Sequence, residues 1–261
     1  MRKTNVFATA GFWIMLAAIV FGIATNGGLA TIMNFLHLPS FIVTFGGAFA
    51  AAMATADSMG DYLDGLKSIF DAYKKVEVKT DRISAKILEL SDVARKEGLL
   101  SLEEACEQLD NEFLEKGIRL IVDGTDPDLV RDILENELTH KAERDKKRIR
   151  FWQDIGAYGP AWGMLGTLLG LINMMRAMGS DMGAIGAGMS LALITTLYGS
   201  ILANWISIPT ARKLEKSSAE EALSMEIAIE GVLSIQAGEN SRIIKEKIKS
   251  IMELEEEPEA A

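Results

Sequence analysis

Four long apolar runs, separated by stretches rich in charge, make up the 261-residue chain. The runs cover about residues 6–24, 36–56, 155–175 and 182–208, and none of them contains Lys, Arg, Asp or Glu. At a helical rise of about 1.5 Å per residue, each run is long enough to cross a hydrocarbon core of about 30 Å. The pattern therefore predicts an all-α membrane protein with four spans. A cleaved signal peptide is the alternative for the first run, but roughly 19 apolar residues exceed the about 7–15 of such a segment.

The charged stretch between the second and third runs has the periodicity of helices. Apolar residues recur at helical spacing over residues 61–76 and again over 83–94, and Gly98 is expected to end the second of these helices. The sequence Ser101-Leu-Glu-Glu104 has the form of a capping box, which predicts a new helix that continues to Phe113. The sequence thus predicts a large helical loop between the second and third spans.

Helix signals continue on both sides of the last two runs. Asp126-Pro127 predicts a helix with proline in its first position, and the helical pattern runs from there into the third apolar run. After the fourth run, residues 212–252 predict two amphipathic helices that separate near Gly238. The acidic end, 253–261, is expected to be disordered.

Basic residues gather on one side of the predicted spans. Residues 2–3 precede the first run, six Lys and Arg precede the third at 141–150, and three follow the fourth at 212–216. The two opposite links hold only Arg176 and Asp181. Because basic flanks favour the cytoplasmic side, both termini and the large loop of this multi-pass membrane protein are predicted to be cytoplasmic. The predicted domains are spans one and two (1–56), a cytoplasmic helical domain (57–154), spans three and four (155–209) and a helical cytoplasmic tail (210–261).

The basic cluster at 141–150 is followed directly by Trp152. Basic side chains next to an aromatic residue are typical of the membrane interface, where they meet anionic lipid headgroups. We therefore expect membrane lipid as a partner here, with a simple topology signal as the alternative. The segment after the second run, which contains Asp57, Asp61 and Asp64, is acidic and adds nothing to the orientation.

Composition excludes several classes of function. The net charge of −10 argues against a nucleic-acid-binding protein, which normally presents a basic face. No zinc spacing, phosphate-binding loop or serine nucleophile elbow occurs, and the glycine-rich segment 183–188 lies inside an apolar run. The single cysteine, Cys106, forms no internal disulfide. The sequence predicts neither an enzyme nor a metal site nor a bound cofactor.

Small and polar residues within the last two runs follow helical spacing. In the third run four glycines at positions 159, 163, 166 and 170 form a stripe that another helix can approach closely. Thr196, Ser200 and Asn204 repeat every four residues in the fourth run, which makes a polar stripe beside Thr195. Such hydroxyls either join helices, at about 0.6–2 kcal/mol each, or line an ion path. Both interpretations remain open from the residues alone.

No carboxylate lies within any of the four runs. Movement of protons or cations across a bilayer usually uses an intramembrane acid. If this chain conducts ions, the acid must therefore come from a partner, with the hydroxyls on the facing wall. The sequence accordingly predicts a hetero-oligomer for an ion-conducting function.

Four segments of the apolar runs resemble one known family. The sequence Tyr158-Gly-Pro-Ala-Trp-Gly-Met-Leu-Gly-Thr-Leu-Leu-Gly170 resembles the third span of the MotA/PomA family, the stator subunits of the bacterial flagellar motor. Leu193-Ile-Thr-Thr-Leu-Tyr-Gly199 and the stretch 204–209 resemble its fourth span, and Gly46-Gly47 in the second run also fits. The four-span layout agrees over essentially the whole chain.

The resemblance implies a location in the cell inner (plasma) membrane, an assembly and several residue roles. Members of the family form a homo-oligomeric ring, in known cases a pentamer, around two copies of a MotB/PomB-type single-span partner that carries an essential aspartate. Pro160 and Pro209 match the prolines held to couple ion passage to movement. Arg95 and Glu103 match the charged residues that act on the rotor switch protein FliG; without the resemblance they would be solvated surface charges.

The resemblance also points to an ion path. Thr167, Thr195 and Thr196 match hydroxyls that sodium-driven members place near the partner's aspartate. Sodium favours oxygen ligands, so the sequence favours Na⁺ over H⁺ as the transported cation, although some proton-driven members are similar here. Two alternatives to a stator subunit remain. An ExbB/TolQ-type energiser of outer-membrane processes typically has three spans, and a self-sufficient channel or transporter would need intramembrane charges or broken-helix repeats.

Overall fold

A computed structural model of the chain describes residues 6–27, 29–73, 80–106, 109, 111–179 and 182–256. Helix is the only regular secondary structure in these residues, which confirms the predicted all-α class. The α-helices are α1 (Val6–Gly27), α2 (Leu38–Phe41), α3 (Gly47–Thr55), α4 (Met59–Ala72), α5 (Thr80–Glu97), α6 (Leu102–Cys106), α7 (Glu112–Val122), α8 (Pro127–Ala177), α9 (Met182–Ile201), α10 (Ile208–Gln236) and α11 (Ser241–Glu256). Two 3₁₀ segments (Leu29–Phe35, Leu99–Ser101) and two π-helical segments (Ile42–Gly46, Leu202–Ser207) complete the order.

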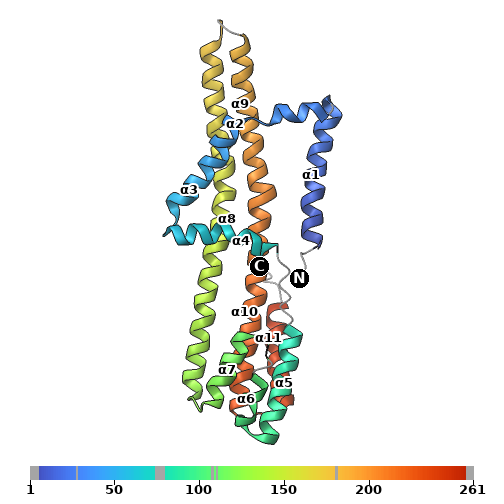
Figure 1. Cartoon of the computed structure of the whole chain (residues 1–261), viewed down its shortest axis with the longest axis vertical. Helices are drawn as coiled ribbons and strands as arrows, with labels where there is room; N and C mark the ends of the chain where they lie inside the picture. Colours follow the sequence, from blue (N-terminus) through green and yellow to red (C-terminus); the bar gives the residue numbers. More distant parts are fainter. Residues whose placement is uncertain are drawn as a thin grey trace. The chain divides into compact units, whose positions relative to one another are not determined.

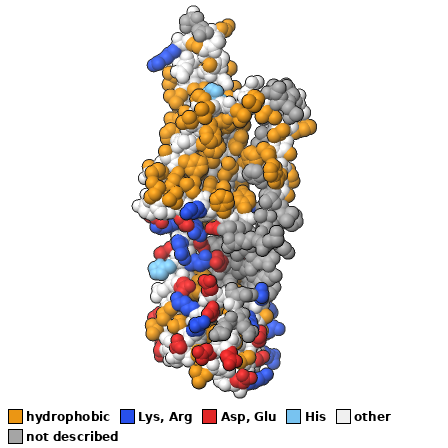
Figure 2. Space-filling model, viewed as in Figure 1, with side chains coloured by type: hydrophobic (Ala, Val, Ile, Leu, Met, Phe, Trp, Pro, Cys, Tyr) orange, Lys and Arg blue, Asp and Glu red, His pale blue; other side chains and the backbone are white. Residues whose placement is uncertain are grey.

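The chain divides into two compact units, each built from two separate parts of the sequence. The first unit comprises Met1–Lys75 and Asp145–Glu215, and the second comprises Val76–Arg144 and Lys216–Ala261. Hydrophobic side chains cover much of the first unit in the view of Figure 2, whereas charged side chains are frequent over the second. The predicted domain boundaries describe where the chain enters and leaves a membrane, and they stay predictions.

Three helical stretches of the first unit are long and apolar enough to cross a membrane. They are Leu38–Thr55, which joins α2 to α3, and apolar windows within α8 and within the continuous helix that starts at Met182. The first predicted span coincides with α1, whose apolar stretch Trp13–Gly22 is shorter. Three of the four spans therefore meet the requirement among the described residues, and the full count stays a prediction.

Buried apolar side chains of the second unit form one core between its helices. Ile87 of α5, Leu114 and Ile118 of α7, Leu134 of α8 and Ile227 of α10 all belong to it. Helices α5, α7, α10 and α11 lie side by side in Figure 1. Burial of these stripes is what holds short helices such as α7 in place, because isolated helices of this length are marginal in water.

The predicted helix boundaries are confirmed at three positions. Gly98 ends α5 with a φ of 92°, and Gly238 separates α10 from α11 with a φ of 68°, a backbone region that favours glycine. Pro127 begins α8, where the Asp126 carboxylate accepts a hydrogen bond from the Asp128 N–H at 3.0 Å. Helix α8 then continues unbroken into the third apolar run, as the pattern predicts.

The predicted capping box at Ser101 is wrong. The Ser101 hydroxyl donates to the Gly98 carbonyl at 2.6 Å instead of accepting from the next turn, and the chain already turns as a 3₁₀ segment from Leu99. Helix α6 ends at Cys106, and Asn111 starts a separate helix by accepting from the Leu114 N–H at 3.0 Å. The asparagine cap competes with a continuous helix through this segment.

The prediction of a disordered end is also wrong for residues 253–256, which belong to α11. The buried side chains Ile244 and Ile248 hold this helix to the core of the second unit, and Lys249 pairs with Glu253 at 3.2 Å. The apolar stripe thus extends helical structure into the acidic end. Residues 257–261 lie outside the described part of the chain.

Candidate functional site

Helices α8 and α9 lie side by side (Figure 1), and glycines on both let their backbones approach closely. A Cβ atom added at Gly170 would lie 2.4 Å from the Gly188 carbonyl oxygen, and one added at Gly163 would lie 2.9 Å from the Thr195 carbonyl oxygen. A Cβ at Gly199 would lie 2.6 Å from the Gly159 carbonyl oxygen. The predicted glycine stripe is therefore confirmed as a helix-packing surface, and α9 contributes a matching stripe.

Two hydroxyls from the paired helices meet at this contact. Thr167 Oγ1 of α8 and Thr196 Oγ1 of α9 lie 2.6 Å apart. Each is also 3.2 Å from the Ala192 carbonyl oxygen, and Thr167 Oγ1 is 3.1 Å from the Gly163 carbonyl oxygen. Since two hydroxyl protons serve these contacts, lone pairs remain on both hydroxyl oxygens. Thr196 is exposed and Thr167 half-buried, so this oxygen cluster borders the surface of the chain.

Thr195 occupies a different environment from its neighbour Thr196. Its side chain is 0% exposed, and its hydroxyl donates to the carbonyls of Leu191 at 2.9 Å and Ala192 at 3.0 Å. Its backbone carbonyl accepts from the hydroxyl of Thr44, a buried residue that the sequence analysis missed, at 3.3 Å. The chain alone does not bring the Thr195 hydroxyl to the exposed cluster.

The other two residues of the polar stripe and the two predicted prolines lie within the same two long helical stretches, α8 and the one that starts at Met182. Ser200 and Asn204 are exposed like Thr196, and the Asn204 amide donates to the Ser200 carbonyl at 3.1 Å. Pro160, inside α8, is exposed and removes the hydrogen bond that its N–H would give to the preceding turn. Pro209 follows the π-helical segment Leu202–Ser207, whose wider turn accommodates a proline in a helix that continues to Gln236.

Arg95 and Glu103 lie on either side of one sharp turn of the second unit. Arg95 is in the last turn of α5, and Glu103 is in the first turn of α6. Both are exposed, and Leu100 projects into solvent between them with 74% of its surface accessible. The turn therefore presents a cation, an apolar side chain and an anion in sequence order.

The acids after the second span bind the basic cluster of the third. Arg148 forms two hydrogen bonds with the Asp64 carboxylate, at 2.6 and 2.7 Å, and these raise the pKa of the guanidinium. Lys147 Nζ lies 3.1 Å from Asp57 and 3.5 Å from Asp61, and its pKa is raised chiefly by the hydrogen bond to Asp57. Asp57, Asp61 and Asp64, which add nothing to the predicted orientation, are thus the ion-pair partners of Lys147 and Arg148 in the basic cluster.

Trp152, which follows the basic cluster, is buried and does not lie at a lipid-facing surface of the chain, while the contact of the cluster itself with headgroups stays a prediction. The Trp152 side chain is 2% exposed, and its indole N–H donates to the Gly65 carbonyl at 3.1 Å and to Ser68 Oγ at 3.0 Å. The glycine gives the aromatic side chains room: a Cβ at Gly65 would lie 2.6 Å from the Phe151 ring. The tryptophan therefore fixes α4 to α8 within the first unit.

Replacing Arg148 with Ala is expected to lower the free energy of unfolding by about 1–2 kcal/mol, because a charged, partly buried hydrogen-bonded pair contributes more than an exposed one. Thermal unfolding of the full chain in mild detergent measures this. Arg131→Ala is the control, since Arg131 and Glu135 form an exposed pair at 3.4 Å that is expected to contribute less than about 0.5 kcal/mol. Equal losses from both variants would contradict the assigned role of Arg148.

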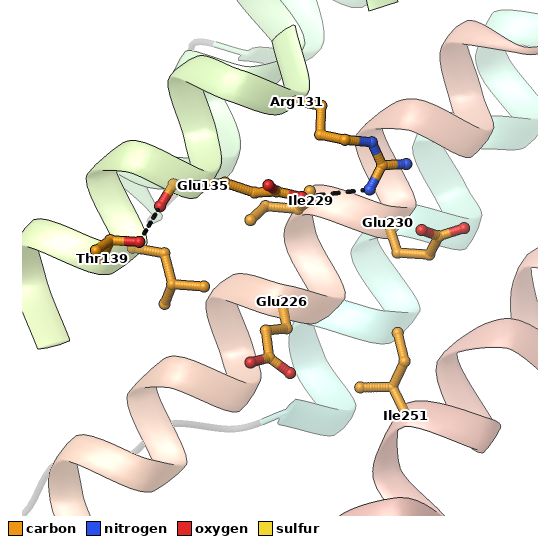
Figure 3. A pocket seen from close by; sticks show the side chains of 8 residues that line it. Arg131, Glu135, Thr139, Glu226, Ile229, Glu230 and Ile251 are labelled. Carbon is orange, nitrogen blue, oxygen red and sulfur yellow. Dashed lines mark hydrogen bonds and ion pairs between the residues drawn. The ribbon is translucent and has the colours of Figure 1, made fainter. Parts of the chain in front are cut away.

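A cavity of about 430 Å³ in the second unit lies between α8, α10 and α11 (Figure 3). Its polar wall consists of Arg131 and Glu135 on one helix and Glu226 and Glu230 on the facing helix. Arg131 is paired with Glu135, and Glu230 lies 2.8 Å from Lys247. No metal-binding group of His, Cys, Asp and Glu occurs among the described residues. The Glu230–Lys247 pair therefore joins α10 to α11, whereas the Arg131–Glu135 pair lies within α8.

Comparison with known proteins decides the family. The model of the MotA/TolQ/ExbB proton channel family matches residues 105–227. Motility protein A of Treponema phagedenis is 39% identical over 238 residues, which cover 91% of this chain and 90% of that protein. Motility protein A of Borreliella burgdorferi is 40% identical, with 95% and 94% covered. The chain belongs to the motility protein A (MotA) family.

A solved structure agrees with this assignment. A chain of the flagellar MotAB stator complex from Bacillus subtilis superposes with a TM-score of 0.78 at 25% identity, covering 92% of this chain and 96% of that one. Both relatives bear the name motility protein A, and the matching family model is that of a proton channel family. The function is accordingly that of a flagellar stator subunit, in preference to the ExbB/TolQ alternative.

Proposed function

We propose that copies of this chain form a ring, a pentamer, around a MotB-type single-span partner, and that ion flow through this complex turns the ring against the flagellar rotor. The solved relative is a MotAB complex, which supports such a partner. One observation of this chain carries the proposal: the hydroxyls of Thr167 and Thr196 form an exposed oxygen cluster in spans that contain no carboxylate. The partner supplies the acid that the chain lacks.

The exposed cluster provides one wall of the ion path in this proposal. A cation that enters from outside meets the partner's carboxylate opposite Thr196 and neutralises it. Neutralisation removes the cost of placing a charged group against an apolar wall, so the ring can step to its next position. One elementary charge moved across 100 mV supplies about 2.3 kcal/mol for each step.

The three threonines have distinct parts in this wall. Thr167 and Thr196 offer hydroxyl oxygens, and the Ala192 carbonyl oxygen lies 3.2 Å from both. Thr195 supports them from behind, because its buried side chain fills the space left by Gly166. Three oxygens from neutral groups suit Na⁺, which favours oxygen ligands, so we propose Na⁺ as the transported cation with H⁺ as the alternative.

Pro160 and Pro209 couple ion passage to movement in the proposed cycle. Each proline interrupts the hydrogen-bond ladder of its helix, and such positions are where helices bend. Pro160 lies seven residues, about two helical turns, before Thr167 on the same face of α8. A change at the oxygen cluster therefore acts on a helix with a built-in bending point.

The turn between α5 and α6 contacts the rotor switch protein FliG in the proposal. Reversing the charge with Arg95→Glu is expected to reduce swimming speed at least about tenfold, because an opposed charge pair becomes a repulsive one. Swimming speed in soft agar and in liquid, with stator assembly followed by a fluorescent tag, measures the effect. Lys245→Glu, the same charge change at an exposed position of α11, is expected to swim normally.

Assembly separates the two interpretations of Arg95. If Arg95→Glu complexes still assemble at the motor and swimming returns when a rotor acid is changed to Lys, the contact with the rotor is supported. Loss of assembly would show instead that Arg95 stabilises the fold of this chain.

A further inference from the structure

Helix α4 has the pattern of a helix that lies in a membrane surface. It follows α3, an apolar span, after a three-residue link. Met59, Leu63 and Phe70 form an exposed stripe at helical spacing, 55%, 45% and 70% accessible, while Gly65 and Ser68 on the opposite face are buried. An amphipathic helix with an exposed apolar stripe directly after a span belongs at the boundary between headgroups and acyl chains.

A cavity of about 490 Å³ opens beside the start of α4. One part of its wall is apolar and aromatic and includes Ala52 of α3 with Phe151 and Tyr158 of α8. The other part is charged and comes from the link after α3, the first turn of α4 and the neighbouring stretch of α8. A cavity with one apolar and one charged wall at headgroup level suits the region of a phospholipid where the headgroup meets the acyl chains.

Two oppositely charged side chains of this cavity have no ion-pair partner among the described residues. Lys147 is paired with Asp57 and Asp61. Arg150 and Asp154, one turn apart on α8, have no ion pair or hydrogen bond with any residue in the described part of the chain. Opposite charges at this spacing usually pair, although the order with the cation first is the weaker one. A free cation and a free anion therefore border the same cavity about 6 Å apart along the helix.

We infer that this cavity binds the headgroup of a phosphatidylethanolamine-type lipid. The phosphate accepts hydrogen bonds from the Arg150 guanidinium, and the primary ammonium donates to the Asp154 carboxylate. The lipid's glycerol and first methylenes lie against Phe151 and Ala52. This site is independent of the proposed rotation, since it needs only the membrane location of the chain.

The charges of the cavity favour this headgroup over the other common ones. Three acids and two bases line it, a formal sum of −1, so an anionic phosphatidylglycerol headgroup would add repulsion and would bring no cation to the Asp154 carboxylate. The trimethylammonium of phosphatidylcholine has no N–H to donate to the carboxylate. Of these three headgroups, ethanolamine is the one that offers both a phosphate to Arg150 and an N–H cation to Asp154.

Lipid retention by the full-length chain, purified with its natural partners, tests the site. The complex is incubated with equal amounts of phosphatidylethanolamine, phosphatidylglycerol and phosphatidylcholine of matched acyl chains, and retained lipids are counted by native mass spectrometry. The ethanolamine lipid is expected to be retained about tenfold better than the other two, the factor that one charge-assisted hydrogen bond supplies. Free phosphoethanolamine, added at the same concentration as the lipid, is expected not to displace the ethanolamine lipid, because the lipid's glycerol and first methylenes make further contacts with the cavity. Displacement would overturn the assignment to a lipid.

Variants locate the preference in named side chains. Asp154→Asn is expected to abolish the preference for ethanolamine, Arg150→Gln to lower retention of all three lipids, and Asp154→Glu to keep the preference and so report on folding. Arg144→Gln, an exposed basic residue of the same helix outside the cavity, is the matched control. The proposal would be overturned if the natural chain retained the three lipids equally, or if Asp154→Asn kept the preference. It would also be overturned if the variants changed the number of chain copies in the complex while no lipid was retained. The last result would assign the cavity to an interface between copies.

Discussion

Replacing Gly170 with Ala is expected to abolish motility and to lower the yield of folded complex. The added Cβ would lie 2.4 Å from the Gly188 carbonyl oxygen and 2.7 Å from the Ala192 nitrogen, which are backbone atoms that cannot rotate away. Helices α8 and α9 must then separate, which costs about 1–3 kcal/mol or more through lost packing and moves Thr167 away from Thr196. Complex yield from membranes, thermal unfolding and swimming speed measure the loss.

Gly186 is a close control for this effect. It lies on α9 two residues from Gly188, and a Cβ added there meets no atom within 4 Å. Gly186→Ala is therefore expected to be neutral or slightly stabilising, because alanine favours the helix over glycine by about 1 kcal/mol. Equal damage from Gly170→Ala and Gly186→Ala would contradict the close contact of α8 with α9 as the cause.

Replacing Thr196 with Val is expected to reduce ion-driven swimming at least about tenfold, or to change its dependence on sodium, while complex yield stays normal. Valine keeps the shape of threonine but removes the exposed hydroxyl oxygen that lies 2.6 Å from Thr167 Oγ1. Swimming speed across a series of sodium concentrations at constant ionic strength measures the effect. A change in sodium dependence supports an oxygen ligand, whereas a uniform loss supports a proton path.

Thr25→Val provides the comparison for a hydroxyl outside the oxygen cluster. Thr25 is exposed on α1, and its hydroxyl donates to the carbonyl of Gly22 in its own helix, at 3.1 Å. Normal swimming and sodium dependence are expected for this variant. If Thr196→Val behaves like Thr25→Val, the Thr167–Thr196 pair joins helices and is not part of the ion path.

Much of the fold follows from local signals in the sequence. Gly98 and Gly238 end helices because they adopt positive φ, and the glycine spacing of α8 predicts the approach of another helix. The sequence could also have separated Thr195 from Thr196. Thr195 follows Gly188 and Ala192 on the buried small-residue face at helical spacing, whereas Thr196 lies on the exposed face with Ser200.

Other features depend on contacts between distant segments. The burial of Trp152 requires Gly65 and Ser68, more than 80 residues earlier, to face it. The basic cluster appears free in the sequence because its partner Asp64 belongs to another helix. Periodicity assigns a residue to a face of its own helix, but it does not reveal which helix covers that face.

Native mass spectrometry of the tagged chain, purified from its own membranes with every co-purifying protein identified, tests the central claim most directly. We expect a ring of five copies that holds two copies of a single-span partner with an acid in its span, since this chain has none in its four apolar runs. A chain that purifies alone, as a monomer or dimer with ion conductance of its own, would contradict the demand for a partner's carboxylate and the mechanism built on it.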